Sequence, residues 1–221
     1  MSGKSGCWLA AGLLALSFVG CRRPAKPWEG VMSVEKRQSL LVARLGHKFE
    51  DAEAHLELGR IYQQQGRLSD AEFHYKMALR FDPVYWAAQA AMVKLLEAKG
   101  NSAGAQQAAE TFINAVGNSA DRSIELGKAF EKEQLLEYAL RCYQQALRLE
   151  PKSPKPYARL GYFYKNKGDM VRAREYFEKS FNLDWNQPDV VYELGRMGVR
   201  IEVPRTEPKK PVGGEAAKKK K

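Results

Sequence analysis

Cysteine and histidine are both scarce in this chain of 221 residues. The three cysteines, Cys7, Cys21 and Cys142, form no CxxC pair and are too few for the disulfide framework of a small secreted domain. The three histidines are scattered and match no zinc-ligand spacing. We therefore expect no metal and no other cofactor.

Catalytic signatures are also missing. The sequence has no GxSxG, P-loop, HExxH or GxGxxG motif, and its acidic residues form no isolated pair suited to acid–base chemistry. Cys142 stands beside Tyr143 in a core register and has no evident base, so we interpret it as a packing cysteine. We interpret His55 as a packing histidine and His74 as a residue of a helix surface. The sequence therefore predicts a protein that is not an enzyme.

Only one long apolar run occurs, Cys7 to Val19, and its 13 residues fall short of the roughly 20 that span a bilayer as a helix. Lys4 precedes it and small residues end it, which is the anatomy of a signal peptide. The end of the run, Phe18-Val19-Gly20-Cys21, resembles the bacterial lipobox. That resemblance implies cleavage before Cys21 and lipidation of its sulfur. Two features depart from the pattern, Phe18 in place of leucine and the arginines at 22 and 23, and they leave a signal-anchor or an ordinary signal peptide open.

The resemblance also predicts a location. A lipidated Cys21 would hold the chain on a membrane facing the periplasm. Arg22 is not the aspartate that favours inner-membrane retention in enterobacterial relatives, so we expect the outer membrane. The first segments are then a signal peptide at 1–20 and a lipidated N-terminus with an extended tether at 21–33.

A repeat of 34 residues fills the middle of the chain. Leu58-Gly59 recurs as Leu126-Gly127, Leu160-Gly161 and Leu194-Gly195. Aromatic and small residues recur with it: repeat 1 has Tyr62, Ala71, Tyr75, Ala78 and Pro83, and repeat 3 has Phe130, Ala139, Tyr143, Ala146 and Pro151. Apolar residues three or four apart predict two amphipathic helices, A and B, in each unit.

These residues resemble the tetratricopeptide repeat (TPR) over about residues 52–199. The resemblance implies an all-α, right-handed TPR solenoid of stacked antiparallel helix pairs, with about four repeats plus capping helices. We place the repeats at 52–85, 86–119, 120–153 and 154–187. The N-terminal capping helix lies at 34–51, where Leu40, Leu41 and Leu45 cover repeat 1. The C-terminal capping helix is a partial repeat at 188–203, and 204–221 is a disordered Lys-rich tail.

Repeat 2 departs from the pattern. Val93 replaces the glycine, Ala109 replaces the aromatic residue and Phe112 replaces a small residue, a swap that can conserve volume across the helix pair. The glycine-rich linker 100–104 is expected to be the loosest joint. Two interpretations stay open: a drifted repeat that packs normally, or a hinge.

In TPR solenoids the A helices line a concave groove, with repeat positions 2, 5, 9 and 12 pointing into it. Position 9 is basic at four of five places and position 5 is apolar or aromatic throughout. This pattern favours a protein or peptide partner with apolar and acidic groups. The predicted groove residues are Arg60, Lys94, Lys128, Arg196, Leu56, Ile124, Tyr162, Tyr192, Lys155 and Arg159. Lys155 and Arg159 match part of the two-carboxylate clamp of one TPR subclass, but Ala90, Lys94 and Glu125 occupy the other clamp places, so we expect no chaperone-tail function.

The net charge of +10 is concentrated at the two ends. Residues 1–30 carry +3, residues 204–221 carry +5, and the 173 residues between them carry only +2. The basic tail favours contact with an anionic envelope surface. Taken together, the features predict a membrane-anchored TPR adaptor for assembly of an envelope complex, in pilus or secretion, outer-membrane or cell-wall machinery, with no nucleic-acid partner. The alternative is a cytoplasmic or signal-anchored TPR protein whose tail contacts nucleic acid or anionic surfaces.

Overall fold

The computed structural model describes residues 32–201, and this span folds into ten α-helices with no strand. Cys21, its leader and the Lys-rich tail lie outside the described residues. The helices are α1 (Val34–His47), α2 (Ala52–Gln64), α3 (Leu68–Phe81), α4 (Trp86–Ala98), α5 (Ser102–Ala115), α6 (Ala120–Lys132), α7 (Leu136–Leu149), α8 (Pro154–Asn166), α9 (Met170–Leu183) and α10 (Pro188–Arg196).

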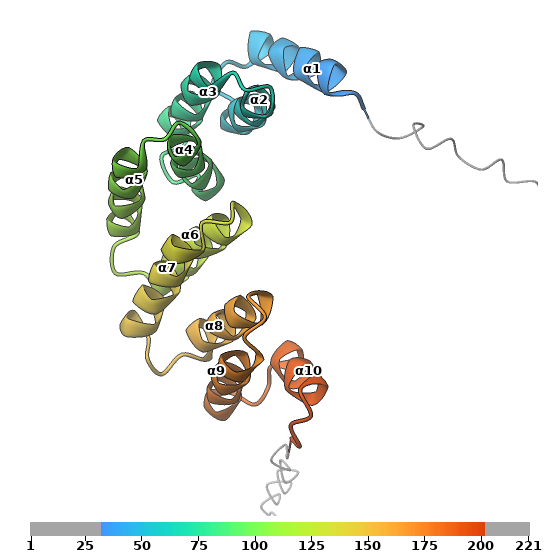
Figure 1. Cartoon of the computed structure of the whole chain (residues 1–221), viewed down its shortest axis with the longest axis vertical. Helices are drawn as coiled ribbons and strands as arrows, with labels where there is room; N and C mark the ends of the chain where they lie inside the picture. Colours follow the sequence, from blue (N-terminus) through green and yellow to red (C-terminus); the bar gives the residue numbers. More distant parts are fainter. Residues whose placement is uncertain (1–31, 202–221) are drawn as a thin grey trace, which may run out of the picture.

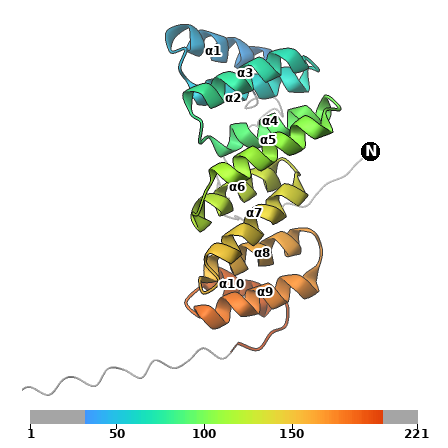
Figure 2. The same cartoon turned by 90° about the vertical axis from the view of Figure 1, so that its left-hand side faces the viewer.

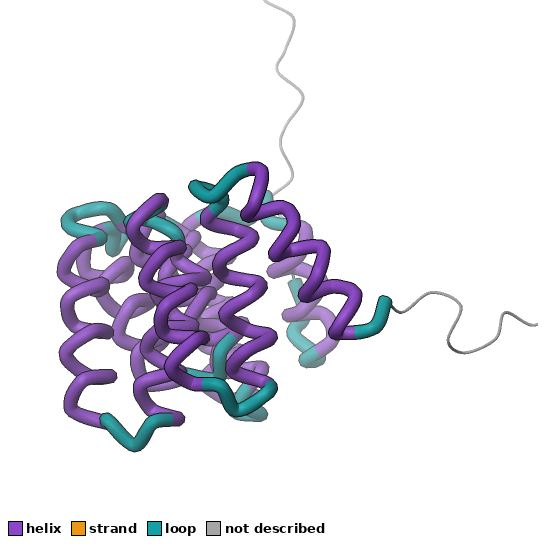
Figure 3. Tube along the Cα trace, turned by 90° about the horizontal axis from the view of Figure 1, so that it is seen from above, coloured by secondary structure: helices purple, strands orange, loops and turns teal. Residues whose placement is uncertain are grey.

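The helices stack in antiparallel pairs along a curved path. The even-numbered A helices follow the inner side of the curve and the B helices α3, α5, α7 and α9 follow its outer side (Figures 1 and 2). Each A helix packs most extensively on the B helix that follows it, except at the C-terminal end. Seen from above, the described chain consists of helices and short loops (Figure 3). The expected all-α solenoid is confirmed.

The helices begin at intervals of 34 residues, as the sequence repeat does. The A helices begin at residues 52, 86, 120, 154 and 188, and α1 precedes α3 by the same interval. Local signals set these starts: the side chains of Asp51 and Ser119 accept the N–H groups of Ala54 and Arg122, and prolines occupy the first turns of α8 and α10. In this register α1 has the place of a B helix and α10 that of an A helix, and the structure of residues 32–201 includes neither partner helix.

A glycine of each regular A helix packs under an aromatic ring of its B helix. A Cβ atom at Gly59, Gly127 or Gly161 would stand 2.5 Å from the ring of Tyr75, Tyr143 or Phe177, respectively. Ordinary carbon contacts are about 3.5–4.0 Å, so a methyl group does not fit without a shift. The glycine therefore sets the close approach of the two helices.

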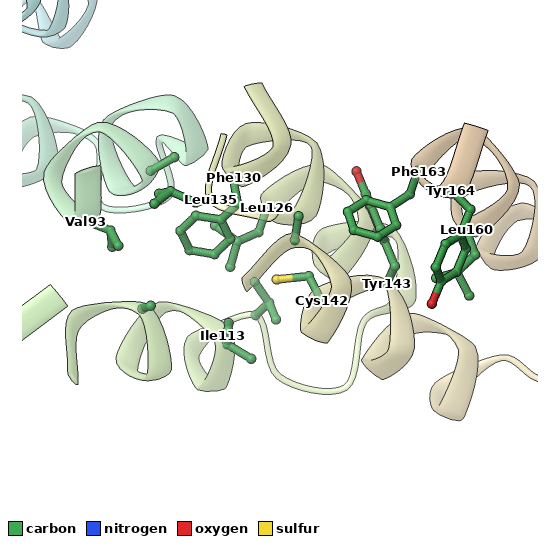
Figure 4. Close-up of a cluster of buried hydrophobic side chains, with 14 of the residues drawn as sticks. Val93, Ile113, Leu126, Phe130, Leu135, Cys142, Tyr143, Leu160, Phe163 and Tyr164 are labelled. Atoms are coloured by element: carbon green, nitrogen blue, oxygen red, sulfur yellow. The ribbon is translucent and has the colours of Figure 1, made fainter. Parts of the chain in front are cut away.

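In repeat 2 the larger residue of this contact lies on the A helix and the smaller one on the B helix. Val93 and Ala109 occupy the glycine and aromatic positions, and both are fully buried in the large core cluster, where Val93 is seen with Leu126 and Phe130 in Figure 4. The pair α4–α5 packs less extensively than the other pairs, and α6 packs mainly on α4 rather than on α5. One detail of the expected linker is wrong, because residues 102–104 belong to the first turn of α5.

The two ends of the solenoid are covered unequally. Leu41 and Leu45 of α1 pack on Ala54, Leu58 and Ile61 of α2. Leu40 is 51% exposed and is not part of this cluster, so the expectation that it covers repeat 1 is wrong. At the other end, Val190 and Leu194 of α10 join the large core cluster. Within residues 32–201 no helix combines the length and hydropathy needed to cross a bilayer.

Candidate concave binding site

A hollow lies on the concave face between three successive A helices, α6, α8 and α10. Its volume is about 380 Å³. It is lined by Asp121, Ile124, Glu125, Lys128, Lys155, Ala158, Arg159, Tyr162, Gln187, Pro188, Asp189 and Val190. The helices that form it occupy the inner side of the lower half of the curve in Figure 1.

Part of the lining is apolar and fixed by the core. Ile124 is 5% exposed and packs with Ala120 and Ala146. Tyr162 is half-buried, with its ring 4.9 Å from that of Phe177 in an edge-on contact. Burial raises the pKa of Tyr162, and the neighbouring Asp189 and Glu193 carboxylates raise it further. The phenol therefore stays neutral and is able to donate a hydrogen bond at physiological pH.

The charged side chains of the hollow are mostly paired with one another. The Lys128 ammonium lies 2.5 Å from a Glu125 carboxylate oxygen, and the Lys155 ammonium lies 3.0 Å from Asp121. Within the part of the chain that the structure describes, Arg159 makes no ion pair, and its guanidinium carbon lies 6.0 Å from the centre of the Tyr162 ring. Arg159 is therefore the cation of the hollow that is most available to a ligand.

The N-terminal half of the expected basic ladder is engaged in the fold. Arg60 reaches from α2 to Glu133 just after α6, with 2.5 Å between the charged atoms, and so links repeat 1 to repeat 3 across repeat 2. Lys94 lies 3.5 Å from Glu97 on its own helix. Leu56 is 3% exposed because it packs against α3 and α4, so the expectation that it lines the groove is wrong.

Two further predicted residues lie at the C-terminal end of the solenoid. Tyr192 is 64% exposed on α10, and the Arg196 guanidinium carbon lies 5.8 Å from the centre of its ring. The structure thus brings five of the ten predicted residues together in the hollow: Ile124, Lys128, Lys155, Arg159 and Tyr162.

The predicted groove residues do not include the start of α10, which also lines the hollow. Gln187, Pro188 and Val190 line the hollow beside Asp189. The 34-residue period predicts an A helix here, and Pro188 at its first turn marks the start. The period does not specify how α10 is placed relative to α6 and α8, so it could not show that this first turn lines the hollow.

The histidines differ in part from expectation. His55 is fully buried, as predicted, and its Nε2 atom lies 2.9 Å from the carbonyl oxygen of Phe49. Its Nδ1 atom lies 2.9 Å from Nδ1 of His74. His74 is only partly exposed and stacks on Tyr62, so its assignment to a helix surface is wrong. Burial lowers the pKa of both rings, that of His74 to about 4.

Cys142 is fully buried, more deeply than the partly buried packing cysteine expected from the sequence, and burial raises the pKa of its thiol to about 12. A thiol that stays protonated is a poor nucleophile, which agrees with a packing role. Over residues 32–201 no three side chains of His, Cys, Asp or Glu gather in a way that could hold a metal ion.

Comparison with known proteins identifies the repeats. Sequence models of the tetratricopeptide repeat match residues 52–85 and 154–185, and a further TPR model matches residues 127–168. The chain therefore contains tetratricopeptide repeats, as their resemblance predicted. TPR proteins bind protein or peptide partners.

Two relatives match most of the chain at 27% identity. One is the type IV pilus assembly protein PilF of Pseudomonas aeruginosa, matched over 154 residues that are 66% of this chain and 58% of that protein. The other is the human protein O-mannosyl-transferase TMTC3, matched over 161 residues that are 73% of this chain and 16% of that protein. The chain thus spans less than two thirds of either relative. Among solved structures, MamA of Desulfovibrio magneticus RS-1 is 24% identical, with 70% of this chain and 88% of that chain covered and a TM-score of 0.37.

Proposed function

We propose that this chain is a membrane-anchored TPR adaptor that binds a protein partner in its concave hollow during assembly of an envelope complex. The observation that carries the proposal is the hollow between α6, α8 and α10, which combines an apolar floor with a charged rim. Binding sites for protein segments commonly join apolar anchoring surface to a few polar groups that fix orientation.

The chemistry of the hollow favours a partner segment with an apolar side chain beside an acidic one. Ile124 and Tyr162 offer the apolar surface, and Arg159 offers a guanidinium that a carboxylate can bind with two hydrogen bonds. Lys128 and Lys155 are already neutralised by Glu125 and Asp121. They can contribute to binding only if the partner displaces those carboxylates.

The proposed membrane anchor and envelope complex are supported by two observations outside the hollow. The sequence before residue 22 resembles a lipoprotein signal with Cys21 as the lipidated residue. The match to PilF, a protein named for type IV pilus assembly, favours a pilus or secretion complex over outer-membrane or cell-wall machinery. On these grounds we propose a lipid-anchored position facing the periplasm, on the outer membrane.

Charge reversal at the unpaired Arg159 and the neighbouring Lys155, which pairs with Asp121, tests the binding site. Lys155→Glu with Arg159→Glu is expected to abolish co-purification of a specific partner from native membranes while helicity stays unchanged. The matched control is Arg174→Glu with Lys179→Glu, two exposed residues of α9 on the outer side, which should leave the partner bound. Unchanged co-purification with the hollow variant would contradict the proposed site.

Mass spectrometry of the protein isolated from its native cell tests the anchor. We expect a chain that begins at a diacylglycerol-modified Cys21. A chain that begins at Met1 and carries no lipid would overturn the anchored setting and favour the cytoplasmic alternative, without bearing on the hollow itself.

A further inference from the structure

One face of α10 is an A-helix surface on which, within residues 32–201, no following B helix packs. Gly195 holds the repeat position of Gly127 and Gly161, yet no atom lies within 4 Å of a Cβ atom built on it. Tyr192 is 64% exposed, whereas Leu56 and Ile124, its counterparts in α2 and α6, are 3% and 5% exposed. Within the described chain, the glycine that elsewhere receives an aromatic ring is vacant here, and an exposed aromatic ring lies one turn away.

We propose that this face of α10 binds the same face of a second copy of the chain, with the two helices antiparallel across a twofold axis. The Tyr192 ring of each copy would pack over Gly195 of the partner subunit. A twofold interface requires a surface that is complementary to itself, with a knob and a hole on the same patch. Tyr192 and Gly195 supply both, three residues apart on one helical face.

The charges on the same face fit this arrangement. Asp189 and Arg196 lie at opposite ends of the stripe, seven residues or about 10 Å apart, with Tyr192 between them. Antiparallel pairing brings Asp189 of each copy opposite Arg196 of the partner subunit and so creates two ion pairs. A parallel arrangement would instead place like charges together. The charge pattern therefore selects the antiparallel pairing.

Two other occupants from the same chain fit less well. Residues 202–221 contain three prolines and no aromatic residue, so they offer neither a continuous helix nor a ring for Gly195. Helix α1 of a second copy carries Arg37 and Arg44 where the other B helices place small residues such as Ala71 and Ala78. These arginines are bound to Glu57 and to Asp51 and would hold another helix away.

Charge exchange on α10 tests the arrangement. The full chain, in a detergent matched to the solvent density, should self-associate to a dimer in sedimentation equilibrium. Asp189→Arg and Arg196→Asp should each weaken the dimer at least tenfold, because each change replaces the two ion pairs of the symmetric dimer with two pairs of like charges. The double exchange D189R/R196D should restore it. Tyr192→Ala should weaken it about 30-fold, as expected for a central aromatic anchor.

A control pair and helicity measurements complete the design. The Arg141–Glu110 pair of α7 and α5 is similarly exposed and distant from α10, so Arg141→Glu and Glu110→Arg should leave the dimer unchanged. Circular dichroism reports whether each variant folds. A wild-type chain that stays monomeric, or a dimer that ignores the single exchanges, would overturn the proposal. So would a folded double exchange that fails to restore the dimer.

Discussion

The contact between glycine and aromatic ring can be tested by giving repeat 3 the valine and alanine that repeat 2 has at these two positions. Gly127→Val places a side chain where its Cβ atom would stand 2.5 Å from the Tyr143 ring and 3.1 Å from the Cβ atom of Cys142. The ring or the helix must move by about 1 Å to reach ordinary contact distance. Overpacking of this kind costs about 1–3 kcal/mol, and the better helix propensity of valine returns only a few tenths of a kcal/mol.

The second half of the prediction is compensation. Tyr143→Ala alone should cost about 3–5 kcal/mol, since it empties a fully buried site and removes the hydrogen bond that the phenol donates to Glu131. In the double variant the valine fills part of the space left by the ring, as Val93 does beside Ala109. The stability lost in the double variant should therefore be smaller than the sum of the two single losses by at least about 1 kcal/mol.

Thermal unfolding followed by circular dichroism provides the assay. For a chain of this length each kcal/mol shifts Tm by about 2–4 °C, so Gly127→Val should lower Tm by several degrees. Gly46→Ala is the control, because Gly46 lies in α1 with nothing within 4 Å, and this change should raise Tm slightly. A neutral Gly127→Val, or strictly additive losses in the double variant, would refute the account of how the helix pairs are spaced.

Three further predictions concern other parts of the fold. Burial lowers the pKa of His55 and His74, so the fold favours their neutral forms; this contribution to stability is fully present above the ordinary histidine pKa of about 6.5 and is lost as the pH falls towards 4. His74→Phe should make the free energy of urea unfolding less dependent on pH over this range, and an unchanged pH dependence would contradict the role of His74. Gln134 has a φ of +63°, a left-handed backbone conformation that strains a residue with a side chain, so Gln134→Gly should raise the free energy of urea unfolding by about 1 kcal/mol. A lower free energy of unfolding would contradict this strain. Arg60→Glu should lower Tm by breaking the pair with Glu133, and adding Glu133→Arg should recover most of the loss; a double variant no better than the single would exclude a direct contribution of the pair.

The sequence predicts the features of this fold that repeat. The helix pairs, the buried glycine–aromatic contact and the exchanged sizes at Val93 and Ala109 all follow from local periodicity and residue volume. A sequence period assigns the same environment to every residue at the same repeat position. For the core positions of the four complete repeats this holds, whereas Gly195 of α10 is exposed.

The parts that could not be predicted depend on how one repeat is rotated against the next. Leu56 and Tyr192 share a column, yet Leu56 is buried by the following repeat and Tyr192 is exposed on the last described helix. The Arg60–Glu133 pair joins residues 73 positions apart, a proximity that the 34-residue period does not predict. The hollow likewise forms where three A helices converge, which no single repeat encodes.

Site-specific photo-cross-linking tests the central claim most directly, because it reports which side chains a partner touches. A photoreactive residue at position 162, in the hollow, should cross-link to a protein partner in the native cell. The same residue at position 171, which is 71% exposed on the outer side of α9, should give no such product. The account predicts that the product at 162 disappears when Arg159 is changed to glutamate. Equal products from both positions, or none from 162, would contradict a partner held in the concave hollow.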